Sequence, residues 1–304
     1  MKEGHIPGKL LLFGEYTILA GGQALALPLP NFSGHWAKGQ TAKPFDLRPF
    51  LDYLDRLQQE EQLLTPLRLD QFRQDLAAGL FFRSTIPAGY GAGSSGALCA
   101  AVYQRYAAPA QPPTGASSLP RLQKQLAQLE SFFHGQSSGA DPLVCYLKQP
   151  LLITSSGLET VQPVPSGRDA GRWYLIDTQV PRQTAPLVER FKARYRQTAF
   201  QQEVNGRLLP LSEMAIRAFL QGDAKSLEKA MRSLSKAQLN LLAEFIPEAF
   251  RAGWEAGLEA GTYFMKLCGA GGGGFLLGYA PAEKHPRIQS LKARIIPLAG
   301  SLFL

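Results

Sequence analysis

The chain has few cysteines and few charged residues for its length. Its cysteines, Cys99, Cys145 and Cys268, are far apart and form no C-x-x-C pair. An odd number of widely spaced cysteines argues against a disulfide framework and a cysteine-based zinc site, and favours buried thiols in a reducing compartment. Charged residues make up 18% of the 304 residues and hydrophobic residues 45%. A chain of this size and composition can bury a full core, and we expect two domains.

Long hydrophobic runs and blocks of basic residues are also missing. The N-terminal sequence MKEGHIPGK lacks the apolar segment of a signal peptide, and no run of 18 apolar residues follows it. The formal net charge is +8, but the basic residues are scattered along the chain. Because nucleic-acid binding needs a basic stripe, we do not expect nucleic acid as a partner. Because no long apolar run is present, we do not expect a membrane either. The composition predicts a cytoplasmic protein whose positive charge suits a small anionic ligand.

What the sequence does contain is a glycine loop at 87–97, PAGYGAGSSGA. The preceding LFFRSTI predicts a strand over 80–86, and the following ALCAAVYQRYAA predicts a helix over 97–108. Glycines ahead of a helix N-terminus present backbone N–H groups to an anion, and we expect phosphate. The loop lacks the Gly-Lys-Ser/Thr of a Walker A motif. A dinucleotide site, weakened by the missing acidic residue about 20 positions on, and a ligand-free turn remain open.

Periodicity and chain-breaking residues predict the organisation of the remaining sequence. Residues 108–119 are typical of an exposed connection, and the polar segment 163–172 of a boundary between domains at 1–170 and 171–304. The further predicted strands are 9–13, 16–20, 24–30, 173–177, 263–268, 275–279 and 295–297. The further predicted helices are 47–62, 120–133, 184–201, 210–221, 224–243 and 247–260.

Four other segments accompany the loop: PGKLLLFGEY at 7–16, ESFFHGQSSGAD at 130–141, DTQVPRQT at 177–184 and KLCGAGGGG at 266–274. Together with the loop, they resemble the GHMP kinase superfamily, and within it the short bacterial form of mevalonate kinase most closely. The resemblance implies an α+β fold of two domains. The N-terminal domain would be ATP-binding and ribosomal protein S5 domain 2-like, and the C-terminal domain ferredoxin-like, with ATP and Mg²⁺ in the cleft between them.

The resemblance also implies roles for individual residues. Asp141 would be the catalytic carboxylate that accepts the proton of the substrate hydroxyl, with Lys9 near it. Ser95 and Glu130 would bind Mg²⁺, which prefers oxygen ligands. The residues implied to bind ATP are Pro87, Gly89, Gly91, Gly93, Ser94 and Ser95. Those implied to line the acceptor side are Glu15, Tyr16, Arg182, Thr184, Gly271 and Gly272.

Each of these residue types also has a purely structural interpretation. Ser95 and Thr184 are residue types that cap helices, and Asp141 precedes Pro142 as an N-cap residue does. A glutamate such as Glu130 is mostly exposed on a helix, and a lone lysine such as Lys9 extends its ammonium to solvent. The glycines at 269–274 suit a flexible hairpin turn, and His134 suits a cation at a helix C-terminus.

The chain departs from the resembled pattern at several positions. Tyr16 stands where mevalonate kinases usually carry His, Ser137 replaces Pro, Ala92 replaces Leu, and Gly96 replaces Ala. The implied activity is ATP- and Mg²⁺-dependent phosphorylation of a small alcohol, mevalonate first, for isoprenoid precursor synthesis. Alternatives are a phosphomevalonate, sugar or homoserine kinase, a diphosphomevalonate decarboxylase, and a catalytically silent nucleotide-binding protein. The expected partner is the small-molecule alcohol, with a homodimer left open.

Overall fold

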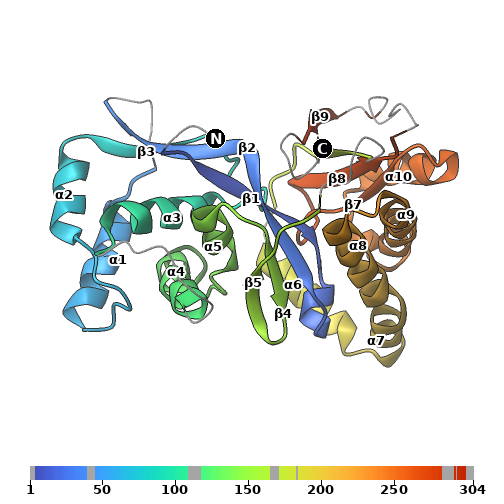
Figure 1. Cartoon of the computed structure of the whole chain (residues 1–304), viewed down its shortest axis with the longest axis horizontal. Helices are drawn as coiled ribbons and strands as arrows, with labels where there is room; N and C mark the ends of the chain where they lie inside the picture. The colour runs from blue at the N-terminus through green and yellow to red at the C-terminus, as the bar shows by residue number, and fades with distance from the viewer. Residues whose placement is uncertain are drawn as a thin grey trace. The chain divides into compact units, whose positions relative to one another are not determined.

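The computed structural model describes residues 4–39, 45–108, 118–164, 171–182, 184–282, 291 and 293–298. These residues form two compact units that are not consecutive in sequence (Figure 1). Unit 1 takes its residues from Met1–Lys9, Leu27–Pro87 and Ala92–Gln149. Unit 2 takes its residues from Leu10–Ala26, Ala88–Gly91 and Pro150–Leu304. The first two strands and the glycine loop therefore each contribute residues to both units.

Unit 1 is mainly helical. Strand β2 pairs antiparallel with β3, with Gly34 opposite Ser84 and Lys38 opposite Leu80. Helices α3, α4 and α5 pack against one another (Figure 1). The strands that contribute to this unit are β1 (Ile6–Phe13), β2 (Ala24–Lys38) and β3 (Leu80–Ser84). The helices are α1 (Arg48–Gln59), α2 (Leu69–Ala77), α3 (Ser94–Tyr106), α4 (Ser118–His134) and α5 (Ala140–Leu147).

Helix α3 is buried almost all round, because most of its residues are small or apolar. Its small side chains let two other helices approach it closely. At the far end of α3, the ring of Tyr106 lies 4.6 Å from that of Phe72 and 6.0 Å from that of Trp36. The Tyr106 hydroxyl donates to the buried Asp75 carboxylate. The core of unit 1 thus surrounds the helix that follows the glycine loop.

Unit 2 is built around a four-stranded antiparallel sheet in the order β7-β8-β6-β9. In this sheet β6, which comes first in the sequence, lies between β8 and β9. This is the strand order of a ferredoxin-like fold. The strands of unit 2 are β4 (Leu151–Thr154), β5 (Gly157–Thr160), β6 (Arg172–Asp177), β7 (Phe264–Leu267), β8 (Phe275–Ala280) and β9 (Arg294–Pro297). The predicted α+β class with a ferredoxin-like C-terminal sheet is confirmed.

The α-helices of unit 2 that the structure describes lie in the sequence between β6 and β7. Helices α8 and α9 lie side by side, and α9 packs on β7 (Figure 1). The α-helices are α6 (Thr184–Tyr195), α7 (Thr198–Glu203), α8 (Leu209–Gln221), α9 (Ala224–Leu241) and α10 (Glu248–Ala260). Short helical segments are η1 (Thr17–Ala20), η2 (Val204–Leu208) and η3 (Ala243–Phe245). In the described part of the chain, no helix is long and apolar enough to cross a membrane.

Most predicted elements are present, and several predictions need correction. The strand predicted over 16–20 is wrong: Tyr16 has a φ of 64° and the 3₁₀ turn η1 follows it. The helix predicted over 184–201 is interrupted between α6 and α7. The predicted ranges do not include α2, α5, β4 or β5. The predicted connection at 108–119 and the predicted boundary at 163–172 lie largely outside the described residues.

Candidate functional site

The glycine loop ends in an open helix N-terminus. Gly89, Gly91 and Gly93 have φ values of 75°, 68° and 77°, a region that glycine enters without a steric cost. A Cβ on Gly93 would lie 2.7 Å from the Cγ of Lys9, so the loop needs glycine there for space as well. Gly93 is the N-cap of α3 and has no side chain to bind the first-turn N–H groups. The N-cap residue therefore offers these groups no side-chain acceptor, and phosphate binding at this helix N-terminus stays a prediction.

The expected proximity of Lys9 and Asp141 is observed. The Lys9 ammonium on β1 lies 2.9 Å from the Asp141 carboxylate, and the two side chains are 11% and 39% exposed. Helix α5 begins at Ala140 and its N-cap is Gly139, so Asp141 is a first-turn residue and not the N-cap. A carboxylate is favoured in the first turn by the helix dipole. Asp141 is thus held beside a cation and still accessible to solvent.

Glu130 is buried, with 4% of its surface exposed, so its interpretation as a solvated helical residue is wrong. Its Oε1 accepts a hydrogen bond from Ser95 Oγ at 3.1 Å, and its Oε2 accepts one from Ser137 Oγ at 2.5 Å. Burial, followed by the nearby charge of Asp141, raises the pKa of Glu130 to about 7. The two serines offset only part of this cost. The ionised form of Glu130 is therefore unfavourable in the protein alone, and a nearby cation would offset that cost.

His134 joins this cluster, which the sequence analysis did not predict. Its Nε2 lies 3.0 Å from Ser95 Oγ, within hydrogen-bond distance. A spacing of four residues places His134 and Glu130 on the same face of α4. That spacing is the signal that identifies His134. The Ser95 hydroxyl is engaged by Glu130 and His134, which does not support the interpretation of Ser95 as a capping residue.

The cluster has the chemistry of a magnesium site that also needs a ligand's oxygens. Ser95, Glu130 and Asp141 offer hydroxyl and carboxylate oxygens, which Mg²⁺ prefers. In the part of the chain that the structure describes, no group of three or more His, Cys, Asp or Glu residues could hold a metal by itself. Mg²⁺ usually binds through one or two carboxylates together with phosphate oxygens and water. The residues present fit such a shared site.

In unit 2, the predicted acceptor residue Glu15 is paired with a residue that the sequence analysis gave no role. Lys266 Nζ lies 2.5 Å from Glu15 Oε1, and the two side chains are 0% and 1% exposed. Lys266 also donates to the carbonyl of Leu267 at 2.7 Å. Burial raises the pKa of Glu15, and the charge of Lys266 opposes the rise. The pair connects the end of β1 to β7 within this unit.

Tyr16, the next predicted acceptor residue, is also engaged within unit 2. Its hydroxyl donates to the carbonyl of Ala270 at 2.6 Å, and its ring stacks on Phe191 at 4.4 Å. It is 4% exposed. In the glycine run, the Gly272 N–H donates to the carbonyl of Phe245 at 2.6 Å. These contacts hold the segment that contains Gly271 and Gly272 in a defined conformation.

Arg182 connects the two glycine segments of unit 2. Its backbone N–H donates to the carbonyl of Gly89 at 3.2 Å, and its Nη1 donates to the carbonyl of Cys268 at 2.6 Å. Its Nε is buried without a hydrogen-bond partner among the described residues. Thr184 is exposed at the start of α6. Glu15, Tyr16 and Arg182 thus all contact residues 266–270, and their role in acceptor binding stays a prediction.

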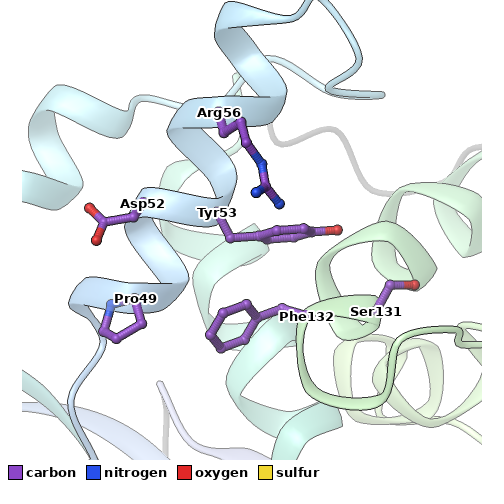
Figure 2. A pocket seen from close by; sticks show the side chains of 6 residues that line it. All are labelled: Pro49, Asp52, Tyr53, Arg56, Ser131 and Phe132. Carbon is purple, nitrogen blue, oxygen red and sulfur yellow. The ribbon is translucent and has the colours of Figure 1, made fainter.

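A separate hollow lies between α1 and α4. Figure 2 shows the aromatic side chains of Tyr53 and Phe132 side by side in it, with ring centroids 5.5 Å apart. Its volume is about 520 Å³. It is lined by Pro49, Asp52, Tyr53, Arg56, Ser131 and Phe132. None of the predicted site residues lines this hollow, and it plays no part in the functional argument.

Two protein-family profiles match parts of this chain. The GHMP kinases N-terminal domain profile matches residues 58–149, and the GHMP kinases C-terminal profile matches residues 215–294. No curated protein sequence matches the chain.

Three solved structures illustrate the structural likeness. The Methanococcus jannaschii mevalonate kinase has a TM-score of 0.64 at 16% identity, with 96% of each chain covered. The Streptococcus pneumoniae phosphomevalonate kinase has a TM-score of 0.56 at 17% identity, with 96% of each chain covered. The Lactococcus lactis galactokinase has a TM-score of 0.60 at 14% identity, with 98% of this chain and 94% of the other covered. At such identities the likeness shows the fold and no substrate.

The pKa of Glu130 predicts a pH dependence of stability. Because this pKa is raised from 4.5 to about 7, the folded chain binds more protons than the unfolded chain between these values. The free energy of unfolding of the metal-free protein should therefore fall as the pH rises through this window. Urea unfolding of wild type and Glu130→Gln across pH 4.5–7.5 measures it, with the exposed Glu60→Gln as control. Equal slopes for wild type and Glu130→Gln would contradict the assignment.

The buried Glu15–Lys266 pair predicts a second stability effect. Lys266→Met should lower the free energy of unfolding by about 3–5 kcal/mol, because it leaves the Glu15 carboxylate buried without a partner. The double variant Glu15→Gln, Lys266→Met should recover most of this loss, since it removes both charges. Denaturant unfolding followed by tryptophan fluorescence measures both, because Trp173 and Trp254 are buried in unit 2. A Lys266→Met variant as stable as the wild type would show that the pair is not intact in solution.

Proposed function

This chain belongs to the GHMP kinase superfamily, since its two domain profiles together match more than half of the chain, and from that premise we propose that it transfers the γ-phosphoryl group of ATP to the hydroxyl of a small alcohol. The observation that carries the proposal is the cluster in unit 1. There, the Lys9–Asp141 ion pair and the Ser95–Glu130 hydrogen bond lie next to the open N-terminus of α3. This combination supplies the parts that phosphoryl transfer needs.

Asp141 would receive the proton of the acceptor hydroxyl. Its carboxylate is 39% exposed, so an alcohol can reach it, and the Lys9 contact fixes its orientation. The ammonium of Lys9 would also stabilise negative charge on the transferring group. Little covalent chemistry falls to the protein in phosphoryl transfer, so positioning and electrostatics supply most of the rate. The buried Lys9 and the helix-anchored Asp141 would provide this positioning and this electrostatic stabilisation.

Ser95 and Glu130 would hold Mg²⁺ together with phosphate oxygens of ATP. Mg²⁺ supplies charge neutralisation and orientation of the phosphates when it is bound. The N–H groups at the start of α3 would bind phosphate oxygens, with the glycine backbone allowing close approach. Burial and the charge of Asp141 make the ionised Glu130 carboxylate unfavourable in the protein alone and raise its pKa, so a bound cation would stabilise the ionised form.

Mevalonate is the first acceptor to test. The matches at 130–141 and 177–184 to the mevalonate kinase pattern support it. Structural neighbours include mevalonate, phosphomevalonate and galactose kinases, so the fold is compatible with several acceptors. Tyr16, at the position where mevalonate kinases usually carry His, keeps its hydroxyl on Ala270. This departure favours an acceptor screen over a single-substrate assay.

A coupled assay of ADP release, run over mevalonate, phosphomevalonate, diphosphomevalonate, homoserine and galactose, tests the proposal. We expect Mg²⁺-dependent turnover with one of these alcohols, mevalonate first. Release of carbon dioxide from diphosphomevalonate would indicate the decarboxylase alternative. ATP binding without turnover of any alcohol would support a silent nucleotide-binding protein and overturn the kinase proposal.

Replacing the proposed catalytic carboxylate should separate chemistry from binding. Asp141→Asn should lower kcat by about a hundredfold or more, because general-base and orienting groups contribute 10²–10⁴-fold. ATP affinity should change little, since Asp141 is assigned to the acceptor hydroxyl. Steady-state kinetics and nucleotide titration measure the two effects. The exposed Asp70→Asn is the matched control, and near-normal turnover by Asp141→Asn would show that the assigned role is wrong.

A further inference from the structure

Ser137 makes two hydrogen bonds that connect the proposed metal ligand to the helix carrying the proposed catalytic carboxylate. Its hydroxyl donates to Glu130 Oε2 at 2.5 Å and accepts from the backbone N–H of Gly139 at 2.9 Å. Glu130 is on α4, and Gly139 is the N-cap of α5, two residues before Asp141. One side chain therefore touches both sides of the short connection between these helices.

The rest of the connection is also held in place, so the Ser137 contacts act on a defined backbone. Gln123 on α4 donates to the carbonyl of Ser138 at 2.8 Å. The Ser138 hydroxyl accepts from the N–H of Ala140 at 3.3 Å. A Cβ on Gly139 would lie 2.4 Å from the carbonyl oxygen of Gln123, which shows how closely the connection approaches α4.

The hydroxyl also meets a requirement of the buried carboxylate. Glu130 is almost fully buried, and each of its oxygens accepts from a serine, Ser95 or Ser137. A buried carboxylate oxygen that loses its hydrogen bond carries a desolvation penalty and tends to move or take up a proton. Either change would spoil Glu130 as a ligand. Ser95 contacts Oε1, so it leaves Oε2 to Ser137.

We propose that Ser137 is a positioning residue for phosphoryl transfer, which holds the Glu130 carboxylate ready for Mg²⁺ and sets its place relative to Asp141. The proposal rests on the proposed function, because it assigns Ser137 to the same metal and acceptor chemistry. It is specific to this sequence: a proline at this position, as in the resembled pattern, has no hydroxyl to donate to Glu130. Groups that orient metal ligands through hydrogen bonds are worth about 10–100-fold in metal affinity or activity.

The test compares Ser137→Ala with Ser137→Thr, which keeps the hydroxyl, and with Ser138→Ala, which removes the neighbouring hydroxyl that does not contact Glu130. Two quantities are measured on each variant: Mn²⁺ affinity of the ATP-saturated protein by electron paramagnetic resonance, and kcat and KM with the accepted alcohol. Thermal unfolding of each variant checks the fold. If Ser137→Ala does not fold, Ser137→Cys replaces it, and its weak thiol donor should give an intermediate loss.

We expect Ser137→Ala to weaken Mn²⁺ binding and lower kcat by about 10–100-fold each. KM for the alcohol should stay within about twofold. Ser137→Thr and Ser138→Ala should remain near wild type in both measurements. Wild-type Mn²⁺ affinity in Ser137→Ala, or an equal loss in Ser138→Ala, would overturn the proposal. Wild-type protein that binds Mn²⁺ and ATP but phosphorylates no alcohol would overturn the proposed function, while the Mn²⁺ comparison would still decide the role of Ser137.

Discussion

The burial of Glu130 beside Asp141 is the constraint on which unit 1 depends. Two carboxylates close enough to interact share one lysine, Lys9, and burial together with the charge of Asp141 raises the pKa of Glu130. Hydroxyls of Ser95 and Ser137 satisfy Glu130 without neutralising it. A cation shared with an anionic ligand would complete the charge balance. A bound cation would thus offset the cost of the ionised Glu130, which is what the proposed magnesium–phosphate site requires.

The packing of three helices brings the residues of this cluster together. Ser95, Glu130 and Asp141 come from α3, α4 and α5, which pack closely because the side chains along α3 are small. A Cβ on Gly96 would lie 2.9 Å from the backbone N of Pro142 and 3.0 Å from the carbonyl carbon of Asp141. This contact gives a physical reason for glycine where the resembled pattern has alanine. With glycine at this position, the start of α5, which carries Asp141, lies directly against α3.

The buried carboxylate of Glu15 differs from that of Glu130, because it has a lysine of its own as partner. Lys266 neutralises it in a fully buried pair, so it has no excess charge to offer a cation. A buried ion pair adds little net stability to a fold. Removing only one of its partners is strongly destabilising, because a charge is then left buried without a partner. With Tyr16 on Ala270 and Arg182 on Cys268, the pair defines the conformation of the segment before the glycine run. These contacts are all within the protein and explain how the segment is held in place. They do not identify the acceptor.

Much of the fold and the site is predictable from the sequence, and the failures have identifiable causes. The glycine loop and the helix after it follow from residue pattern and spacing, whereas the Lys9–Asp141 contact and the ferredoxin-like sheet are implied by the family resemblance. Residue type alone favours an exposed Glu130, and only its distance from Asp141 in the motif indicates otherwise. The strand predicted at 16–20 is wrong because no feature of the local sequence indicates the positive φ of Tyr16. Lys266 is 251 residues from Glu15, and no sequence periodicity relates the two.

The most direct test of the account is a crystal structure of the protein with Mg²⁺ and a non-hydrolysable ATP analogue. The account predicts Mg²⁺ with Ser95 Oγ and a Glu130 carboxylate oxygen among its ligands, and phosphate oxygens on the N–H groups at the start of α3. Nucleotide bound elsewhere, or Mg²⁺ held without Ser95 and Glu130, would contradict it.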